Sequence, residues 1–142
     1  MTSNWMIYGA NGFSAQLAVE KAVTQGRRPI LAGRNAAAIE PLAQAYGLES
    51  RIFSLMDVDH VIPHLEDVKV VSHCAGPYSA TAEPMMKACI RSGTHYTDIT
   101  GEIDVFLLAQ SLSKEAAASG TLLCPGVGFD VIPTDCVAAK LK

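Results

Sequence analysis

The chain has 142 residues, of which 49% are hydrophobic and 18% are charged, and its formal net charge is −3. This length suits one domain with a sizeable buried core, and the composition argues against disorder. No long basic run favours binding to nucleic acid or to an anionic membrane, and no apolar stretch reaches membrane-spanning length. We therefore expect neither kind of partner.

The N-terminal stretch Met1–Tyr8 lacks a charged segment followed by a long apolar run, so we expect no signal peptide. The four cysteines form no C-x-x-C pair, which argues against a zinc site or a disulfide framework. Two of them, Cys74 and Cys124, lie in apolar runs and are predicted to be buried in strands. These features together predict a cytoplasmic protein.

Six short apolar runs alternate with longer helical patterns along the chain. The expected strands are Trp5–Tyr8, Pro29–Ala32, Arg51–Ser54, Val68–Cys74, His95–Ile99 and Thr121–Cys124. The expected helices cover about 14–25, 35–46, 58–65, 81–92, 105–119 and 133–142, and glycines follow several of them, as left-handed C-terminal residues do. Asn35 and Asp57 stand where helix caps are expected. Pro41 predicts either a kink in the second helix or a start near Ile39 or Glu40.

Strands that alternate with helices predict parallel strands joined by right-handed crossovers. The fold class is therefore α/β: a doubly wound parallel sheet of about six strands in the order 3-2-1-4-5-6, which is the Rossmann NAD(P)-binding fold. The sequence contains no linker, so residues 1–142 are expected to form one dinucleotide-binding domain.

The first expected strand runs directly into a glycine-rich turn, Gly9-Ala10-Asn11-Gly12-Phe13-Ser14-Ala15. Gly9 permits a tight turn, Gly12 lets a diphosphate approach the backbone, and Ala15 lets the helix pack closely on the sheet. Free amides and the helix dipole then attract phosphate. Glycine also marks ordinary turns, but the strand–turn–helix context favours cofactor binding by residues 9–14.

The second expected strand ends at Gly33-Arg34-Asn35, where an NAD-preferring fold has an acidic residue that binds the ribose 2′-hydroxyl. No carboxylate lies between Thr24 and Ile39. The Arg34 guanidinium would attract a 2′-phosphate, and Asn35 can add a hydrogen bond. The pattern therefore predicts NADP over NAD; the alternative is that Arg34 is an ordinary solvated side chain.

Two further segments follow strand ends and are candidates for cofactor contact. Asp57 follows the third strand, where a carboxylate can accept a hydrogen bond from adenine, although a helix cap is an equal alternative. Cys74-Ala75-Gly76-Pro77-Tyr78 leaves the fourth strand beside the point where strand order reverses, which is where ligands bind in such sheets. Gly76 would allow close approach to the cofactor, while Pro77 and Tyr78 would stiffen the loop.

Five motifs in this order resemble those of the saccharopine dehydrogenase-like oxidoreductases, in the branch that includes trans-acting enoyl reductases. They are Tyr8–Ser14, Ala32–Asn35, Cys74–Tyr78, Gly93–Glu102 and Gly126–Asp135. The resemblance implies an NAD(P)-binding domain followed by a second α+β domain that supplies much of the substrate pocket and often a dimer contact. That second domain is expected to be absent from this chain, and an exposed apolar patch is expected where it would pack.

The catalytic residues are left open. The carboxyl ends of the later strands carry the candidates Tyr78, Tyr96, Asp98, Glu102 and Asp130. Asp98 and Glu102 could orient a substrate or act as acid or base, but capping a helix or closing a loop is the more common role. His60 and His64 share a helical face without a third ligand, so no metal site is expected.

The sequence thus predicts the NADP-binding half of an oxidoreductase that transfers hydride between NADP(H) and an imine derived from an amino acid or an enoyl substrate. The cofactor half alone is expected to be inactive. The alternative is a dinucleotide-binding module that senses or regulates without turnover.

Overall fold

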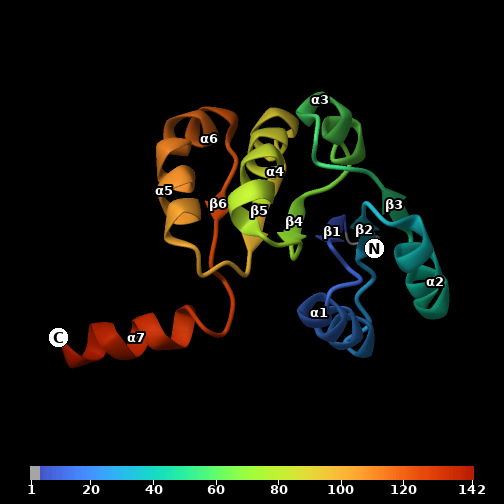
Figure 1. Ribbon diagram of the computed structural model, residues 1–142, viewed down its shortest axis with the longest axis horizontal. Coiled ribbons are helices and arrows are strands. Elements are labelled where there is room, and N and C mark those ends of the chain that lie inside the picture. The colour runs from blue at the N-terminus through green and yellow to red at the C-terminus, as the bar shows by residue number, and fades with distance from the viewer. Residues whose placement is uncertain (1–3) are drawn as a thin grey trace.

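The computed structural model describes residues 4–142, which form one parallel sheet in the order β3-β2-β1-β4-β5-β6 (Figure 1). The strands are β1 (Trp5–Tyr8), β2 (Ile30–Gly33), β3 (Ser50–Ile52), β4 (Val70–His73), β5 (His95–Asp98) and β6 (Leu123–Cys124). The predicted doubly wound fold and its strand order are confirmed. Residues 1–3, part of the stretch expected to lack a signal peptide, lie outside the described residues.

Helices cover both faces of the sheet. They are α1 (Phe13–Thr24), α2 (Ala36–Tyr46), α3 (Val58–Val61), the 3-10 helix η1 (Ile62–His64), α4 (Tyr78–Ser92), α5 (Ile103–Ser111), α6 (Ser113–Ser119) and α7 (Ile132–Leu141). Figure 1 shows α1 and α2 on one face and α3 to α6 on the other. Within residues 4–142, no helix combines the length and apolar character that a bilayer crossing needs.

Two apolar cores lie on opposite faces of the sheet, because neighbouring side chains of a strand point to opposite sides. In β1, Met6 and Tyr8 belong to the core beneath α4, while Ile7 belongs to the core beneath α1 and α2. Ala15 is buried in the second core, as expected for a residue that lets α1 pack closely. The two cores fix where the strands end, and those ends build the site described below.

Several predicted boundaries are wrong in detail. The pattern over 105–119 forms two helices, α5 and α6, because the chain bends at Leu112, whose side chain is buried. Helix α2 begins at Ala36 and contains Pro41, so the late start does not occur. Helix α4 begins at Tyr78 rather than at 81, and the Glu102 side chain accepts hydrogen bonds from the amides of its first two residues.

Cys74 and Cys124 are half-buried rather than buried. Cys74 lies just beyond β4, and Cys124 lies in the edge strand β6, where a neighbouring strand is present on one side only among the described residues. An edge strand leaves more of its side chains accessible than a central one, so the apolar run overstated the burial of Cys124.

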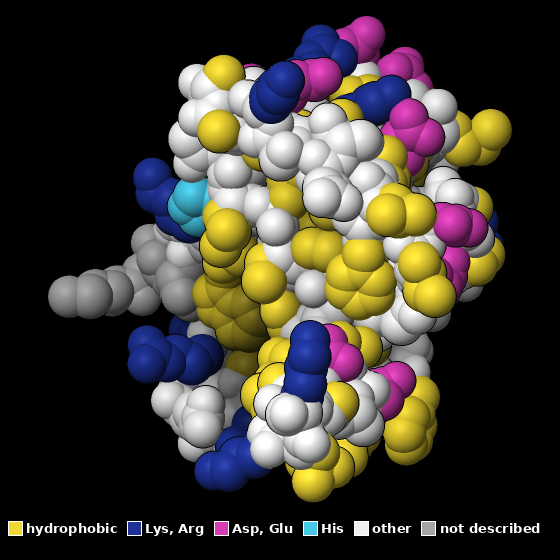
Figure 2. Space-filling model, turned by 90° about the vertical axis from the view of Figure 1, so that its left-hand side faces the viewer, with side chains coloured by type: hydrophobic (Ala, Val, Ile, Leu, Met, Phe, Trp, Pro, Cys, Tyr) yellow, Lys and Arg dark blue, Asp and Glu magenta, His cyan; other side chains and the backbone are white. Residues whose placement is uncertain are grey.

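One face of the molecule, beside β6 and α7, exposes apolar side chains. Helix α7 points away from the sheet (Figure 1) and has no buried residue. Figure 2 shows hydrophobic side chains across the middle of this face, between charged groups above and below. The exposed apolar residues of α5, of α7 and of the chain on either side of β6 include Ile103, Leu107, Leu122, Phe129, Val137 and Leu141. An exposed patch was expected from the family resemblance; what covers it remains a prediction.

His73, the last residue of β4, is a fully buried titratable group in the core. Its ring lies among the rings of Tyr8, Tyr78 and Tyr96, with centroid distances of 5.5, 5.5 and 5.9 Å. Its Nε2 lies 3.0 Å from Thr81 Oγ1, whose hydroxyl donates to the Ala75 carbonyl 2.6 Å away. The hydroxyl has only one proton, so Nε2 donates in the shared bond.

Protonation of His73 would put a charge and a second N–H in this core. Its Nδ1 is buried without a hydrogen-bond partner among the described residues. Burial accordingly lowers the pKa of His73 from 6.5 to about 3. The unfolded chain therefore binds a proton that the folded chain excludes at any pH between these values.

We predict that acid weakens the fold before the carboxylates titrate. Because the folded-state pKa is depressed, the stability contribution is present above the usual pKa and is lost as pH falls below about 6.5. Between about pH 7 and about pH 5.5, His73 alone should lower the free energy of unfolding by about 1 kcal/mol. Urea unfolding at both pH values measures this change, and His73→Gln should flatten it. His60→Gln, at an exposed histidine, is the control; equal slopes in the wild type and His73→Gln would contradict the prediction.

Candidate functional site

A cavity of about 630 Å³ lies at the carboxyl ends of β1 to β4. The loops after these four strands and the first turns of α4 surround it, because the carboxyl ends of parallel strands lie at the same edge of the sheet. The residues that line it are Tyr8, Gly9, Asn11, Gly12, Gly33, Arg34, Asn35, Ser54, Leu55, Met56, Cys74, Ala75, Gly76, Pro77, Ala80 and Thr81. Most of the residues singled out in the sequence therefore meet around one space.

The turn between β1 and α1 brings backbone amides to this cavity. Gly9 has a φ of +79°, and a Cβ built on it would lie 2.8 Å from the Ala75 Cβ, so only glycine fits where these two loops touch. Gly12 is the N-cap of α1 and makes no side-chain cap, and the first turn of α1 contains no acidic residue. The amides at this helix end are available to an anion.

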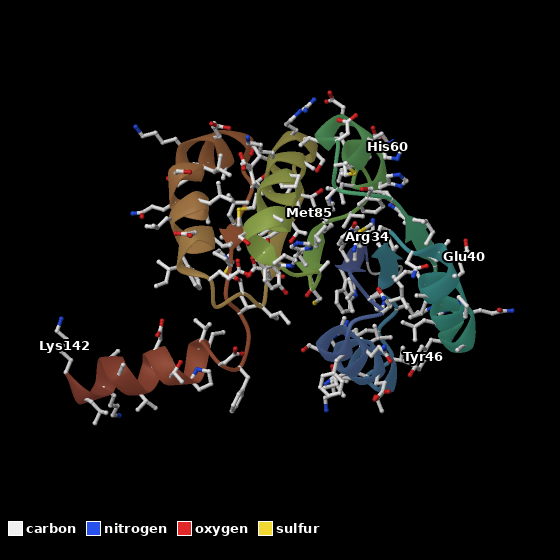
Figure 3. All side chains as sticks on the ribbon, viewed as in Figure 1. Arg34, Glu40, Tyr46, His60, Met85 and Lys142 are labelled. Carbon is white, nitrogen blue, oxygen red and sulfur yellow. The ribbon has the colours of Figure 1, made fainter. Side chains whose placement is uncertain are left out.

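Arg34 follows β2 and reaches the cavity from its other side. Its side chain lies over the middle of the sheet, whereas Glu40 of α2 lies on the outer side (Figure 3). No hydrogen bond or ion pair links Arg34 to another described residue, and the described lining contains no Asp or Glu. Asn35 occupies the N-cap position of α2 as predicted, but its side chain makes no capping hydrogen bond. Both side chains thus remain available to a ligand.

The loop after β4 forms the third wall. Thr81 Oγ1 lies 2.6 Å from the Ala75 carbonyl and 3.0 Å from the Pro77 carbonyl, which fixes the loop against the first turns of α4. Burial raises the pKa of the Cys74 thiol, and the neighbouring Ser72 hydroxyl offsets this in part. Cys74 is therefore a neutral wall group rather than a reactive thiolate.

Five of the predicted cofactor-binding residues lie outside the cavity lining. Ala10 is buried and its amide donates to the Ala32 carbonyl, 3.2 Å away. Phe13 and Ser14 are exposed in the first turn of α1. The Asp57 side chain caps α3 by accepting from the amide of Asp59, and the Tyr78 hydroxyl donates to the His73 carbonyl. Contact between these residues and a cofactor stays a prediction.

Sequence reasoning missed six lining residues: Tyr8, Ser54, Leu55, Met56, Ala80 and Thr81. Strand order alone would have brought the end of β3, and hence residues 54–56, beside Arg34. Tyr8 donates its hydroxyl to the Phe53 carbonyl at 3.0 Å, and burial raises its pKa to about 12, partly offset by Arg34. The hydroxyl of Tyr8 therefore stays neutral at physiological pH.

Two of the three carboxylates named as catalytic candidates, Asp98 and Glu102, accept structural hydrogen bonds. Asp98 is fully buried and accepts from the Tyr96 hydroxyl at 2.6 Å and from the amides of Thr100 and Gly126 at 3.0 and 2.7 Å. Glu102 caps the N-terminus of α4, which accounts for the early start of that helix. Neither residue lines the cavity, and neither does Asp130.

His60 and His64 lie with their rings edge-on and their centroids 5.6 Å apart. The His64 ring stacks on Phe53 at 4.5 Å, and burial lowers the pKa of His64. Across residues 4–142, no group of three or more His, Cys, Asp or Glu side chains is arranged to hold a metal ion. His64 packs on Phe53, whereas His60 is exposed.

Known proteins share this fold and these motifs. A trans-acting enoyl reductase of Mycobacterium leprae is 33% identical over 138 residues, which cover 92% of this chain but 33% of that protein. The chain thus spans about a third of the length of this relative. Trans-acting enoyl reductases of Mycobacterium tuberculosis match to a similar degree.

Solved structures support the fold at lower identity. Saccharopine dehydrogenase (L-Glu forming) from Saccharomyces cerevisiae superposes with a TM-score of 0.76 at 22% identity, over 90% of this chain and 28% of that one. A yeast methylglyoxal/isovaleraldehyde reductase complexed with NADPH gives a TM-score of 0.67 at 19% identity, over 85% of this chain and 52% of that one.

The family model of the saccharopine dehydrogenase NADP binding domain matches residues 5–123, from β1 to the start of β6. The matched range includes every wall of the cavity and the Asp98 and Glu102 loop. On this match, the chain belongs to the saccharopine dehydrogenase NADP-binding domain family.

Proposed function

We propose that this chain binds NADP(H) in the cavity described above and serves as the cofactor half of an oxidoreductase. The observation that carries the proposal is that an uncapped helix N-terminus and an available arginine share one cavity whose described lining has no carboxylate. Both features attract phosphate, and they follow different strands, as the separate diphosphate and 2′-phosphate of NADP require. A volume of about 630 Å³ is within the usual range for cofactor sites.

Each wall has a part in holding the dinucleotide. The amides at the start of α1 would receive the diphosphate, close to Gly12, where a Cβ would already lie 3.2 Å from the Gly9 carbonyl. Arg34, with Asn35 beside it, would bind the 2′-phosphate. Leu55 and Met56 would lie against the adenine side, since they border the cavity on the β3 side of Arg34. Cys74 to Pro77 would then face the remaining nucleoside.

The nicotinamide, when bound, supplies the hydride chemistry. The described residues bind and orient the cofactor, but the described lining contains no His, Lys, Asp or Glu that could move a proton to a substrate. We therefore propose that substrate contacts come from outside this lining. The resemblance to trans-acting enoyl reductases and to saccharopine dehydrogenase makes an enoyl group or an imine derived from an amino acid the proposed substrate class. A second domain and a dimer contact through it belong to the same proposal.

The same lack of acid–base groups favours a second candidate, a module that senses dinucleotides without turnover. NADPH oxidation by the full-length protein separates the two. Consumption of NADPH with an enoyl thioester or an imine supports the enzyme, whereas tight binding of NADPH without turnover of either substrate supports the sensor.

The test of the cofactor proposal is titration calorimetry of the chain with NADPH and NADH. NADPH should bind at least about tenfold more tightly, because a charge-assisted hydrogen bond to phosphate contributes about 1.5–3 kcal/mol. Arg34→Ala should remove most of this preference by weakening NADPH and sparing NADH. Arg27→Ala removes the same charge outside the cavity lining and should leave both affinities unchanged. Equal affinities of the wild type for the two nucleotides would refute the role of Arg34.

A second substitution tests the phosphate position. Gly12→Val places a branched side chain at the N-terminus of α1, so both NADPH and NADH should lose at least about tenfold in affinity. Ala18→Val, on the exposed face of α1 and outside the cavity lining, is the control and should leave both affinities unchanged. Retained binding in a folded Gly12→Val variant would show that the phosphates bind elsewhere.

A further inference from the structure

Glu102 joins two loops that are distant in sequence. Its Oε1 accepts from the amide of Tyr78 at 2.8 Å and its Oε2 accepts from the amide of Ser79 at 2.7 Å. These amides belong to the first turn of α4, where no helical carbonyl is available to them. One carboxylate from the loop before α5 thus caps a helix that begins 24 residues earlier in the chain.

The backbone of Glu102 is connected to the end of β5 by hydrogen bonds. The Glu102 amide donates to Thr100 Oγ1 at 3.0 Å, and the Thr100 amide donates to Asp98 Oδ1 at 3.0 Å. Asp98 and Thr100 are buried, and Asp98 also holds the amide of Gly126 after β6. Consequently the position of α4 relative to β5 is fixed through Glu102 by a continuous series of hydrogen bonds.

The helix end that Glu102 holds is continuous with the cavity wall. Tyr78 follows Pro77 directly, and Ala75, Gly76, Pro77, Ala80 and Thr81 all line the cavity. Thr81 fixes the loop from within through the Ala75 and Pro77 carbonyls, and Glu102 fixes the same turn from outside. Loss of either contact would leave this wall attached on one side only.

We propose that Glu102 is a positioning residue of the cofactor site: it holds the loop after β4 where the nicotinamide-bearing half of the dinucleotide binds. This inference rests on the proposed function. The cavity extends from Arg34 past Gly12 to Pro77, so a cofactor with its 2′-phosphate at Arg34 and its diphosphate at Gly12 has its other nucleoside at the β4 loop.

The capping also selects between two helix ends. The N-termini of α1 and α4 both border the cavity, and each would attract an anion. The Glu102 carboxylate already occupies the end of α4, so a phosphate there would meet like charge. The end of α1 is free of acidic side chains, and a diphosphate is therefore directed to it.

Glu102 acts by holding amides rather than by moving a proton. Both of its oxygens accept from backbone N–H groups, and these hydrogen bonds lower the pKa of its carboxyl below the usual range. A carboxylate that stays ionised at physiological pH has no proton to donate. Its effect on the reaction is therefore the placement of the wall.

The test compares two ligands on the chain. NADPH has both halves of the dinucleotide, whereas adenosine 2′,5′-bisphosphate has only the half at Arg34 and Gly12. Glu102→Gln loses the charge and turns an NH₂ group toward an amide, so NADPH affinity should fall about tenfold, as expected for loss of one charge-assisted hydrogen bond. The affinity of adenosine 2′,5′-bisphosphate should change by less than about twofold.

Two further variants complete the design. Glu83→Gln makes the same chemical change on α4, where Glu83 pairs with Lys87 and does not line the cavity, so it should alter neither affinity. Glu102→Asp keeps the charge but shortens the side chain, and it should also weaken NADPH alone. It serves as the test variant if Glu102→Gln does not fold.

Each other outcome overturns the inference in a recognisable way. Equal losses for both ligands would mean that Glu102 supports the fold generally, and unchanged NADPH affinity would mean that the wall does not need it. If the wild-type chain binds NADPH no more tightly than adenosine 2′,5′-bisphosphate, the loop after β4 contributes no affinity for the nicotinamide-bearing half, and Glu102 has no such half to position. A wild-type chain that binds neither ligand would instead refute the proposed function.

Discussion

The close approach of Gly9 to Ala75 determines the shape of the site. The chain leaves β1 with a left-handed φ at Gly9, and this turn packs against the loop after β4 so tightly that a Cβ would lie 2.8 Å from the Ala75 Cβ. Because β1 and β4 are neighbours at the centre of the sheet, this contact sets the spacing between the two helices that follow them. The cavity lies above that contact, and its other walls are built around it.

The helices on either side of this contact begin differently. Helix α1 starts without a side-chain cap at Gly12, a residue of the cavity lining, whereas α4 starts under the carboxylate of Glu102. Unsatisfied amides at a helix end cost stability unless water or a ligand accepts their hydrogen bonds. An open end at α1 is thus a feature that binding of an anion would improve, while the closed end at α4 contributes rigidity to the wall.

Local sequence was enough to predict the strands and the glycine turn, because these depend on apolar runs and glycines within about ten residues of one another. The strand order followed from the alternation of strands and helices along the whole chain. The start of α4 could not be predicted in this way, since its cap is a residue 24 positions later. The break between α5 and α6 falls at Leu112, a buried residue that carries no helix-breaking signal in the sequence. For the cavity, residues directly after β1, β2 and β4 were found through their motifs, whereas Leu55 and Met56 carry no motif and come to the site only through the position of β3.

The acidic residues after β5 are hydrogen-bonded to backbone amides, and this bears on where catalysis can occur. Amide hydrogen bonds to a carboxylate stabilise its charged form and tie it to the backbone. Asp98 holds together the loops after β5 and β6, and Glu102 holds the start of α4. Both loops border the apolar face beside β6 and α7, where Ile103 and Phe129 are exposed. The buried polar groups of this region therefore fix the backbone, while large apolar side chains are exposed beside them.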